Sequence, residues 1–444
     1  MNRFFLPVFN PNVEGINLEE YIVATYLVGA KYDEDPIVKG VSIAVEQTTG
    51  SWADIAGETA DIREKYSAKL LGYYEVPDYG NALDLEQEVK KDELRNYVMR
   101  IAFPIVLFDD NVPLMLQCVA GNITALPRVR LLDLDLPETY VKQFKGPKFG
   151  IQGIRDILGV YDRPILNNMI KPCTGYTPEV GADLFYATAS GGVDFIKDDE
   201  LISGDRSFNT IEERVKRNMD AAHRAEAVKG EKTLYTCNVT DEFPKLKENA
   251  MKAIKAGTNG IMVDVYTTGL SGLRMLAEDP EITVPILAHP GGIGVAMSSP
   301  YQGINGAVLA KLCRLCGADI QLVGNPYGKF DVMKYPNIRM LNVMRNKLCD
   351  IKPSLPLFGG GTIAGNIPKI INDVGIDCIM GAGAAVHAFP LGPNKGAKAL
   401  RDAIDATIKN VPLREAAKDS EELQCAIDTW GIVGEADVKK NFLI

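Results

Sequence analysis

The sequence predicts an α/β protein in which a C-terminal (β/α)8 barrel, the TIM barrel, follows an N-terminal α+β domain. The main observation is that eight short apolar runs recur after residue 160, each followed by a polar or glycine-rich loop and a helix-type pattern. Strands buried on both faces read as such continuous runs, and eight strand–helix units over about 250 residues suit a barrel. The runs are Ile165–Ile170, Val193–Ile196, Thr233–Cys237, Gly260–Val265, Val284–Ala288, Asp319–Val323, Leu355–Phe358 and Asp377–Met380.

The second observation is a different alternation of strand and helix signals between about residues 20 and 140. Strands are indicated by β-branched and aromatic residues, and the pattern places helices on one face of an antiparallel sheet, as in a ferredoxin-like domain. The predicted strands are Tyr21–Ala30, Leu70–Val76, Tyr97–Pro104 and Val129–Leu136, and the predicted helices are Ile37–Gln47 and Val112–Val119. The charged segment Asp84–Arg95 is interpreted as a solvated connection.

The segment Pro137–Gly150 separates these two patterns. It contains Gly146, Pro147 and Gly150 and few periodic apolar residues, which favours a linker. We therefore predict an N-terminal domain over residues 1–145 and a catalytic barrel domain over 146–444. From Arg414 onward the chain is expected to form a helix and a tail to which no chemistry can be assigned.

The composition excludes several classes of partner. The chain has 444 residues and a formal net charge of −10, and an acidic chain without a basic block argues against nucleic acid and anionic membranes. No apolar run approaches the roughly 18 residues of a membrane span, and the first residues do not form a signal peptide. The eight cysteines are scattered, as expected in a reducing cytosol. The single Cys313-Arg314-Leu315-Cys316 motif lacks a second pair, and with only three histidines in the chain zinc is not expected.

The stretch from Gly191 to Glu200 carries the strongest chemical signal. Its sequence is Gly-Gly-Val-Asp-Phe-Ile-Lys-Asp-Asp-Glu, a short apolar strand that ends in a lysine and three carboxylates. Strand residues alternate faces, so Lys197 and Asp199 point the same way, and Glu200 stands where the chain turns. Oxygen ligands there would suit Mg²⁺, and a lysine that has reacted with CO₂ offers a carbamate oxygen. The alternative is a structural surface cluster in which the lysine pairs with its acidic neighbours.

In TIM barrels the chemistry sits at the carboxyl ends of the strands, and here nearly every strand end is chemically rich. Strand one ends in Lys171, and strand five ends in His289. A flexible loop with Lys329 follows strand six. Glycine loops follow strands seven and eight, where the backbone could approach a phosphate without side chains in the way. Taken singly, the histidine could be a core residue and the lysine a surface one, but together the strand ends favour an enzyme.

These motifs resemble the RuBisCO superfamily, which contains the large chains of ribulose bisphosphate carboxylase and non-carboxylating relatives. The resemblance runs from about residue 20 to 410 and includes Glu46–Trp52, Gly121-Asn122, Lys171-Pro172, the signature at 191–200, the strand-six loop and both glycine loops. Without it, Glu46–Trp52 and Gly121-Asn122 would be read as turns. The resemblance implies a homodimer in which the N-terminal domain of one subunit completes the active site of the other.

The resemblance also implies roles for individual residues. Lys197 would be carbamylated by CO₂ and would bind Mg²⁺ with Asp199 and Glu200, and Lys171 would move protons at the carbon being enolised. His289 is a further catalytic candidate, and Lys329 would close over the substrate. The residues expected to bind a phosphorylated substrate are Gly360, Gly361, Gly381 and Gly383, with Glu46, Ser51, Trp52 and Asn122 from the partner subunit.

The departures from the carboxylases are as informative. Pro290 stands where they have an arginine that grips the second phosphate, and Ile293 and Leu322 replace histidines. Gly359 replaces a serine, and Cys173 replaces a lysine that serves carboxylation. None of these residues can form an arginine–phosphate pair. We therefore expect a substrate with one phosphate and a less charged or apolar far end.

Among the RuBisCO-like proteins, parts of the barrel resemble the methionine-salvage enolase, which acts on 2,3-diketo-5-methylthiopentyl 1-phosphate. Gly146–Gly150, Ala277–Glu281 and Ser298–Tyr301 carry this similarity, whereas Asn122 replaces the lysine proposed as that enolase's base, and Lys329 is an extra loop lysine.

The sequence thus predicts a cytoplasmic, Mg²⁺-dependent enolase or isomerase of a phosphorylated ketose-like substrate, with methionine salvage as one candidate pathway. Three alternatives stay open: a decarboxylase of a phosphorylated keto sugar acid, a true ribulose-bisphosphate carboxylase with an altered site, and a non-catalytic protein that kept the fold. Because Lys171, Lys197, Asp199, Glu200, His289 and Lys329 are all present, the non-catalytic alternative is the weakest.

Overall fold

The computed structural model describes residues 15–50, 55–76, 94–329 and 334–435. The chain packs as two compact units, one comprising residues up to 144 with 293–312, and the other comprising 145–292 with residues from 313 onward. The inclusion of 293–312 in the first unit was not indicated by the sequence. Within these described residues, no helix is long and apolar enough to cross a membrane.

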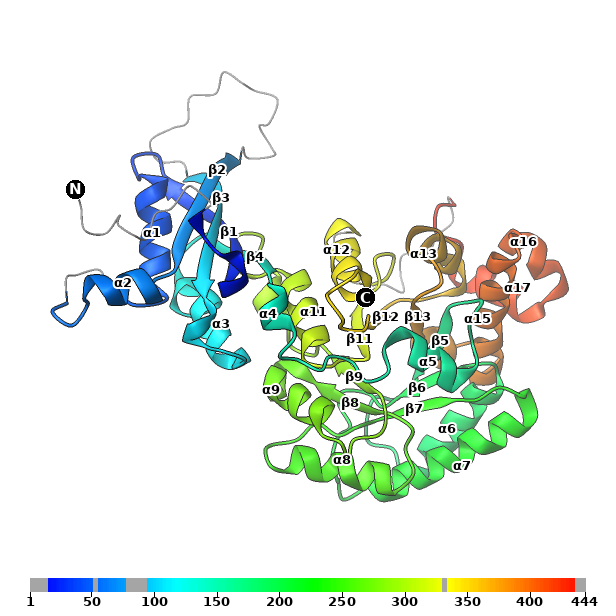
Figure 1. Ribbon diagram of the computed structural model, residues 1–444. Helices are drawn as coiled ribbons and strands as arrows, with labels where there is room; N and C mark the ends of the chain where they lie inside the picture. Colours follow the sequence, from blue (N-terminus) through cyan, green and yellow to red (C-terminus); the bar gives the residue numbers. More distant parts are fainter. Residues whose placement is uncertain (1–14, 51–54, 77–93, 330–333, 436–444) are drawn as a thin grey trace. The chain divides into compact units, whose positions relative to one another are not determined.

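The first unit is built on a five-stranded sheet with the order β10-β4-β1-β3-β2, in which β1, β2, β3 and β4 pair antiparallel and only β10 pairs parallel (Figure 1). The strands are β1 (Tyr21–Lys31), β2 (Lys69–Val76), β3 (Leu94–Pro104), β4 (Val129–Asp135) and β10 (Gly303–Ile304). The helices are α1 (Pro36–Glu46), α2 (Ala60–Tyr66), α3 (Val112–Ala120), α4 (Glu138–Val141) and α10 (Gly294–Met297). Strand β1 is central, and the hydroxyl of Tyr26 ties it to α3 by donating to the Val119 carbonyl at 2.6 Å.

The second unit is a closed barrel of eight parallel strands, β11-β12-β13-β5-β6-β7-β8-β9, surrounded by helices (Figure 1). The strands are β5 (Ile165–Met169), β6 (Phe195–Lys197), β7 (Leu234–Asn238), β8 (Ile261–Asp264), β9 (Ile286–His289), β11 (Ile320–Gly324), β12 (Leu355–Gly359) and β13 (Ile379–Ala382). The helices are α5 (Gly150–Leu158), α6 (Pro178–Ser190), α7 (Ile211–Lys229), α8 (Lys245–Lys255), α9 (Val265–Glu278), α12 (Lys334–Arg345), α13 (Ile367–Val374), α14 (Ala384–His387), α15 (Pro393–Ile408), α16 (Leu413–Ala416) and α17 (Glu421–Trp430). Helix α11 (Gly306–Leu315) begins in the first unit and ends in the second.

The predicted fold class is confirmed in both parts. Each apolar run forms a barrel strand, and the first unit repeats the ferredoxin-like order of strands and helices. The barrel is filled by a buried cluster that takes one apolar side chain or more from every strand. Its members include Ile165, Phe195, Leu234, Met262, Leu287, Ile320, Leu355, Leu357 and Ile379, together with Ile154 and Leu158 of α5. Such interdigitation makes the barrel a packed core and leaves its rim for chemistry.

Two predicted connecting segments remain to be placed. The segment Pro137–Gly150, predicted as a linker, contains the boundary between the two units at residues 144 and 145. It also contains the short helix α4, where Tyr140 and Val141 are buried. Most of the predicted connection Asp84–Arg95 lies outside the described residues, and its last two residues begin strand β3.

Asp319 anchors the chain where it enters the barrel domain. Its carboxylate is buried, and Oδ1 accepts hydrogen bonds from the backbone N–H groups of Phe149 and Gly150 at 2.7 and 2.9 Å. Its Oδ2 accepts from Ile286 N at 2.9 Å. One side chain thereby connects the start of α5 to strands β9 and β11.

We predict that Asp319→Ala lowers the free energy of unfolding by about 3 kcal/mol or more, because three backbone donors lose their acceptor. Asp319→Asn keeps one acceptor oxygen and should lose less. Urea unfolding followed by far-UV circular dichroism measures both. The exposed Asp220→Ala is the control, with an expected change within about 0.5 kcal/mol; an equally small loss for Asp319→Ala would contradict the anchoring role.

Candidate active site

Lys197 is the last residue of β6, and its side chain is almost completely buried, with 1% of its surface exposed. Its Nζ donates to the Asp198 carbonyl at 2.9 Å and lies 3.6 Å from Glu200 Oε2. Burial disfavours the charged amine and lowers the pKa of Lys197 despite the nearby carboxylates of Glu200 and Asp199. A buried lysine that is more easily neutral has the free amine that reaction with CO₂ requires.

Asp199 connects Lys197 to the neighbouring strand end. Lys171, which follows β5, donates from Nζ to Asp199 Oδ2 at 2.6 Å and to Cys173 Sγ at 2.9 Å. Burial opposes the ammonium charge, but the hydrogen bonds to Asp199 and Cys173 outweigh it and raise the pKa of Lys171. Burial also works against the carboxylate of Asp199, yet the Lys171 contact lowers the pKa of Asp199 overall. The two lysines therefore differ: Lys171 is held as a cation and Lys197 is driven toward the neutral form.

Asp198 points away from this cluster and has a structural role. Its Oδ2 accepts from Arg214 Nε at 2.9 Å and from Asn238 N at 3.0 Å, and its Oδ1 accepts from the hydroxyl of Tyr235 at 2.8 Å. Asp198 and Arg214 are both buried. The neighbouring carboxylate, Asp199, accepts instead from Lys171, so the two successive aspartates have separate partners.

His289, at the end of β9, lies between two carboxylates. Its Nε2 is 3.4 Å from Glu200 Oε2, and its Nδ1 is 3.0 Å from Asp264 Oδ1. Both His289 and Asp264 are buried, whereas the Glu200 side chain is 40% exposed. The structure thus brings Lys171, Lys197, Asp199, Glu200 and His289 together at the strand ends.

The donor set fits a magnesium ion only if Lys197 is modified. No group of three or more histidine, cysteine, aspartate or glutamate side chains among the described residues could hold a metal ion. Asp199 and Glu200 offer two hard oxygen ligands, and a carbamate on Lys197 would supply the third. Mg²⁺ is commonly bound by few protein oxygens and several waters, so the residues present fit the expected ion.

The glycine loops pack closely against the loop that follows β11. Lys329 N donates to the Gly360 carbonyl at 3.2 Å, and Gly361 has a positive φ of +86°. A Cβ at Gly361 would lie 2.5 Å from Lys329 N, so only glycine allows this approach. Gly383 borders Lys171, since a Cβ there would lie 3.1 Å from Lys171 Cε. Gly381 lies inside β13 and is buried, while the side chain of Lys329 is exposed.

The predicted partner-site residues lie in the first unit. Glu46 ends α1 and Asn122 begins a short 3₁₀ turn, Asn122–Ala125, and both are exposed. The buried Gln47 links them: its Nε2 donates to the Gln117 and Cys118 carbonyls at 2.7 and 3.0 Å, and its Oε1 accepts from Ile123 N at 3.2 Å. Glu46 and Asn122 therefore belong to one edge of this unit. The other two candidates, Ser51 and Trp52, lie outside the described residues.

His387 and Asn168 were not singled out from the sequence. Asn168, in β5, donates from Nδ2 to the Ala382 carbonyl at 2.8 Å, so its Oδ1 faces His387 Nε2 at 3.0 Å. Burial and the nearby Lys171 charge lower the pKa of His387 to about 4. His387 lies only five residues after the eighth barrel strand. Its position near a strand end is the feature of the sequence from which it could have been predicted as a site residue.

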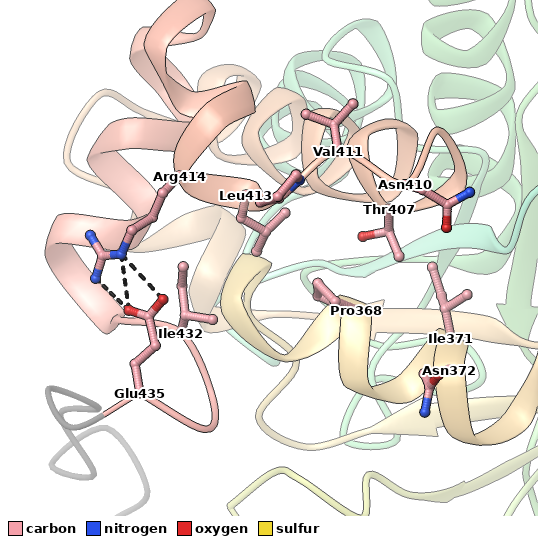
Figure 2. Close-up of a pocket in the computed structure, with 11 residues that line it drawn as sticks. Pro368, Ile371, Asn372, Thr407, Asn410, Val411, Leu413, Arg414, Ile432 and Glu435 are labelled. Atoms are coloured by element: carbon pink, nitrogen blue, oxygen red, sulfur yellow. Dashed lines mark hydrogen bonds and ion pairs between the residues drawn. The ribbon is translucent and has the colours of Figure 1, made fainter.

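A separate pocket of about 630 Å³ lies between α13, the α15–α16 turn and residues 432–435 (Figure 2). Its lining is largely apolar and includes Pro368, Ile371 and Leu413, and the Arg414–Glu435 ion pair stands at one side. It contains none of the predicted site residues.

The two lysines, the neighbouring carboxylates and the histidine lie at the carboxyl ends of parallel barrel strands. This is the arrangement expected of a TIM-barrel enzyme. Comparison with known families identifies the class. Residues 150–430 match the ribulose bisphosphate carboxylase large chain, catalytic domain, and residues 16–140 match the N-terminal domain of the same chain. The protein belongs to the RuBisCO large-chain family, as the motifs predicted.

Individual relatives refine this assignment. The chain is 44% identical over 422 residues to a ribulose bisphosphate carboxylase-like protein of Archaeoglobus fulgidus, covering 94% of this chain and 95% of that one. It is 35% identical over 420 residues to a 2,3-diketo-5-methylthiopentyl-1-phosphate enolase of Geobacillus thermodenitrificans, with coverage of 93% and 98%. The octameric RuBisCO of Pyrococcus horikoshii superposes with a TM-score of 0.86 at 30% identity, covering 97% and 98%. The chain is a RuBisCO-like protein, and these relatives support the expected class, an enzyme of the enolase or isomerase type.

We predict that His387 makes the fold acid-sensitive. Its pKa of about 4 lies below the ordinary value of 6.5, so between these values the unfolded chain binds more protons and stability falls as the pH falls. His387→Gln should remove this component, which amounts to at most about 1.4 kcal/mol per pH unit. Urea unfolding at pH 7, 6 and 5 measures it, with the exposed His223→Gln as control; parallel curves for wild type and His387→Gln would refute the assignment.

Proposed function

We propose that this RuBisCO-like protein catalyses the Mg²⁺-dependent enolisation of a phosphorylated ketose-like substrate. The observation that carries the proposal is the convergence of Lys171, Lys197, Asp199 and Glu200 at adjacent strand ends, with Lys171 bordered by the glycine loop at Gly383. Enolisation removes a proton beside a carbonyl, so it needs a proton acceptor near the carbon and positive charge near the oxygen.

The roles follow from the environments of the side chains. Bound Mg²⁺, held by a carbamate on Lys197 with Asp199 and Glu200, would supply positive charge for the developing enolate oxygen. Lys171 is held in place by Asp199 and Cys173. After losing a proton its amine can accept the proton that leaves the carbon, and the resulting ammonium can donate a hydrogen bond or a proton back to the reacting oxygen or carbon. Exposed Lys329 follows the loop that lies on Gly360 and Gly361, from which it could cover the substrate and exclude water.

Two departures from the carboxylases touch each other in the barrel. A Cβ at Gly359 would lie 3.1 Å from Leu322 Cδ2, so leucine on β11 occupies the space beside the glycine on β12. The surface at these two positions is therefore apolar, where the carboxylases have a histidine and a serine. This arrangement supports a substrate whose far end, opposite the phosphate at the glycine loops, is uncharged or apolar.

Methionine salvage is supported by the 35% identity to the enolase of Geobacillus thermodenitrificans, whose diketone substrate has one phosphate and an apolar end. Asn122 and Lys329 favour a different phosphorylated ketone within the same chemistry. Carboxylation of ribulose bisphosphate and decarboxylation of a keto sugar acid are the alternatives, and they differ from enolisation in whether CO₂ is consumed or released.

We also propose a homodimer in which Glu46, Asn122, Ser51 and Trp52 complete the partner subunit's site. Exposed Glu46 and Asn122 share one edge of the first unit through Gln47, and a solved relative forms an octamer. An exposed polar edge held in place by a buried glutamine suits a surface that contacts another copy of the chain.

The activity test incubates the purified protein in D₂O with Mg²⁺, bicarbonate and 2,3-diketo-5-methylthiopentyl 1-phosphate, and in parallel with ketose monophosphates. Mass spectrometry should show metal-dependent deuterium uptake in at least one of them. Lys171→Ala should slow the uptake by about 10²–10⁴-fold, whereas exposed Lys216→Arg should not change it. Fixation of labelled CO₂ onto ribulose 1,5-bisphosphate at the rate of deuterium uptake, or release of CO₂ from a keto acid, would overturn the proposal in favour of the corresponding alternative.

The carbamate is tested without a substrate. Because a ligand that binds only the folded state raises its stability, the unfolding temperature should rise when Mg²⁺ and bicarbonate are added together, and much less with either alone. Lys197→Arg cannot form the carbamate and should lose the joint effect, while Lys216→Arg should keep it. An equal rise in Lys197→Arg would exclude Lys197 as the modified residue.

A further inference from the structure

Two buried asparagines attach the loop that follows β11 to the loop that follows β12. The β11 loop comprises residues 325–329 and ends at Lys329, and the β12 loop comprises residues 360–366. Asn325 begins the first loop and Asn366 ends the second, and both side chains are completely buried. Each asparagine donates a hydrogen bond to the other loop, so the attachment is reciprocal.

Asn325 contacts the β12 side through its side chain and its backbone. Its Nδ2 donates to Thr362 Oγ1 at 2.9 Å, and its backbone N–H donates to the Gly359 carbonyl at 2.9 Å. Its Oδ1 accepts from Tyr327 N at 2.9 Å, and its carbonyl accepts from Gly328 N at 3.1 Å. The same residue therefore shapes the turn of the β11 loop and attaches that turn to the neighbouring strand end.

Asn366 makes the connection in the opposite direction. Its Nδ2 donates to the carbonyls of Gly361 and Tyr327 at 2.8 and 3.3 Å, and its Oδ1 accepts from Ile363 N at 3.1 Å. Both amide hydrogens and the amide oxygen of this buried side chain are thus engaged. A buried polar network whose members are all satisfied makes the segments that it joins rigid.

Two further contacts hold the β11 loop in the same place. A Cβ at Gly328 would collide with the Gly360 carbonyl oxygen, so the two loops approach as closely as their backbones allow. The hydroxyl of Tyr327 donates to Asp373 on α13, and Lys369 Nζ lies 5.7 Å from the centre of the tyrosine ring. The β11 loop is therefore attached to both the β12 loop and the helix that follows it.

We propose that Asn325 and Asn366 are positioning residues that fix the backbone of Lys329 beside the glycine loop after β12 before any substrate binds. In this arrangement Lys329 N donates to the Gly360 carbonyl at 3.2 Å. The substrate then meets a preassembled pair of loops and does not have to order them. A fixed base for Lys329 takes the place of the flexible loop expected from the sequence.

The consequence for the reaction rests on the proposed function. A phosphate bound at the glycine loop and the amine of Lys329 would be presented by two loops that form one rigid body, so less conformational freedom is lost on binding. If the attachment is broken, only a fraction of the molecules has the assembled site, and the apparent affinity falls by that fraction. The bound substrate reacts at the same rate, so KM should change and kcat should not.

Amide hydrogen exchange of the full-length protein tests the attachment without metal or substrate, so its failure is distinct from a failure of the proposed function. Residue 326 is proline, and the other four backbone amides of the β11 loop all donate hydrogen bonds. These amides should be protected in the ligand-free protein, and inorganic phosphate should change their exchange by less than about twofold. Rapid exchange that phosphate slows would overturn the proposal, because the ligand would then order the loop.

The variant Asn366→Asp tests the reciprocal contact directly. Aspartate keeps an acceptor for Ile363 N and suits the N-cap position of α13, but it cannot donate to the Tyr327 carbonyl. Exchange of the β11 loop should become about tenfold faster or more, because buried groups lose their partners. The control Asn394→Asp removes an amide that donates to the Ala187 carbonyl and should leave the loop unchanged; unchanged exchange in Asn366→Asp would refute the positioning role.

Kinetics with the compound that takes up deuterium separate positioning from a general structural role. Asn366→Asp should raise KM by about tenfold, with kcat changed by less than about threefold. The milder Tyr327→Phe, which removes the hydrogen bond to Asp373, should change KM in the same direction. Tyr161→Phe removes an exposed hydrogen bond to Asp156 and should change neither constant. A lowered kcat at unchanged KM in Asn366→Asp would contradict preassembly.

Discussion

The orientation of the site depends on the buried ion pair between Asp198 and Arg214. Asp198 also accepts from Tyr235 and from the backbone of Asn238, so its direction is fixed by three groups. The next residue, Asp199, accepts from Lys171, and Lys197 lies 3.6 Å from Glu200. A buried ion pair adds little net stability by itself, but here it gives Asp198 partners of its own, apart from the carboxylate that contacts Lys171.

The two lysines show how one small region can hold opposite protonation states. Lys171 contacts a carboxylate directly at 2.6 Å, whereas Lys197 is nearly completely buried and lies 3.6 Å from its nearest carboxylate partner. Close pairing raises the pKa of the first, and desolvation lowers the pKa of the second. Pairs of titratable groups whose environments separate their pKa values are typical of catalytic sites. The same fold can therefore keep one amine charged for proton transfer and the other free to react.

The retained and lost groups divide the site into two parts. The centre at the ends of β5 and β6 keeps its lysines and carboxylates. The glycine loops are kept as well, and at Gly361 only glycine allows the backbone of Lys329 to come so close. In contrast, Leu322 fills the space that a larger side chain at position 359 would need. Pro290 and Cys173 are uncharged, where the carboxylases have an arginine and a lysine. In the proposed function, one subsite can be lost while enolisation is kept, because the residues proposed to hold the metal follow different strands from those proposed to bind the far end of the substrate.

The sequence by itself determined the eight apolar runs, the N-terminal sheet and the cluster from Lys197 to Glu200, because the period of a strand and the burial of a parallel barrel leave direct marks on local sequence. Strand ends shifted by one to three residues, as at β6, since boundaries depend on pairing between strands. Only the tertiary structure decided which partners each charge has: Asp198 with Arg214, Asp264 with His289, and His387 with Asn168. These residues are 16 to 219 positions apart in the chain, and long-range contacts of this kind depend on how the strands and helices pack, for which a single sequence carries no local signal.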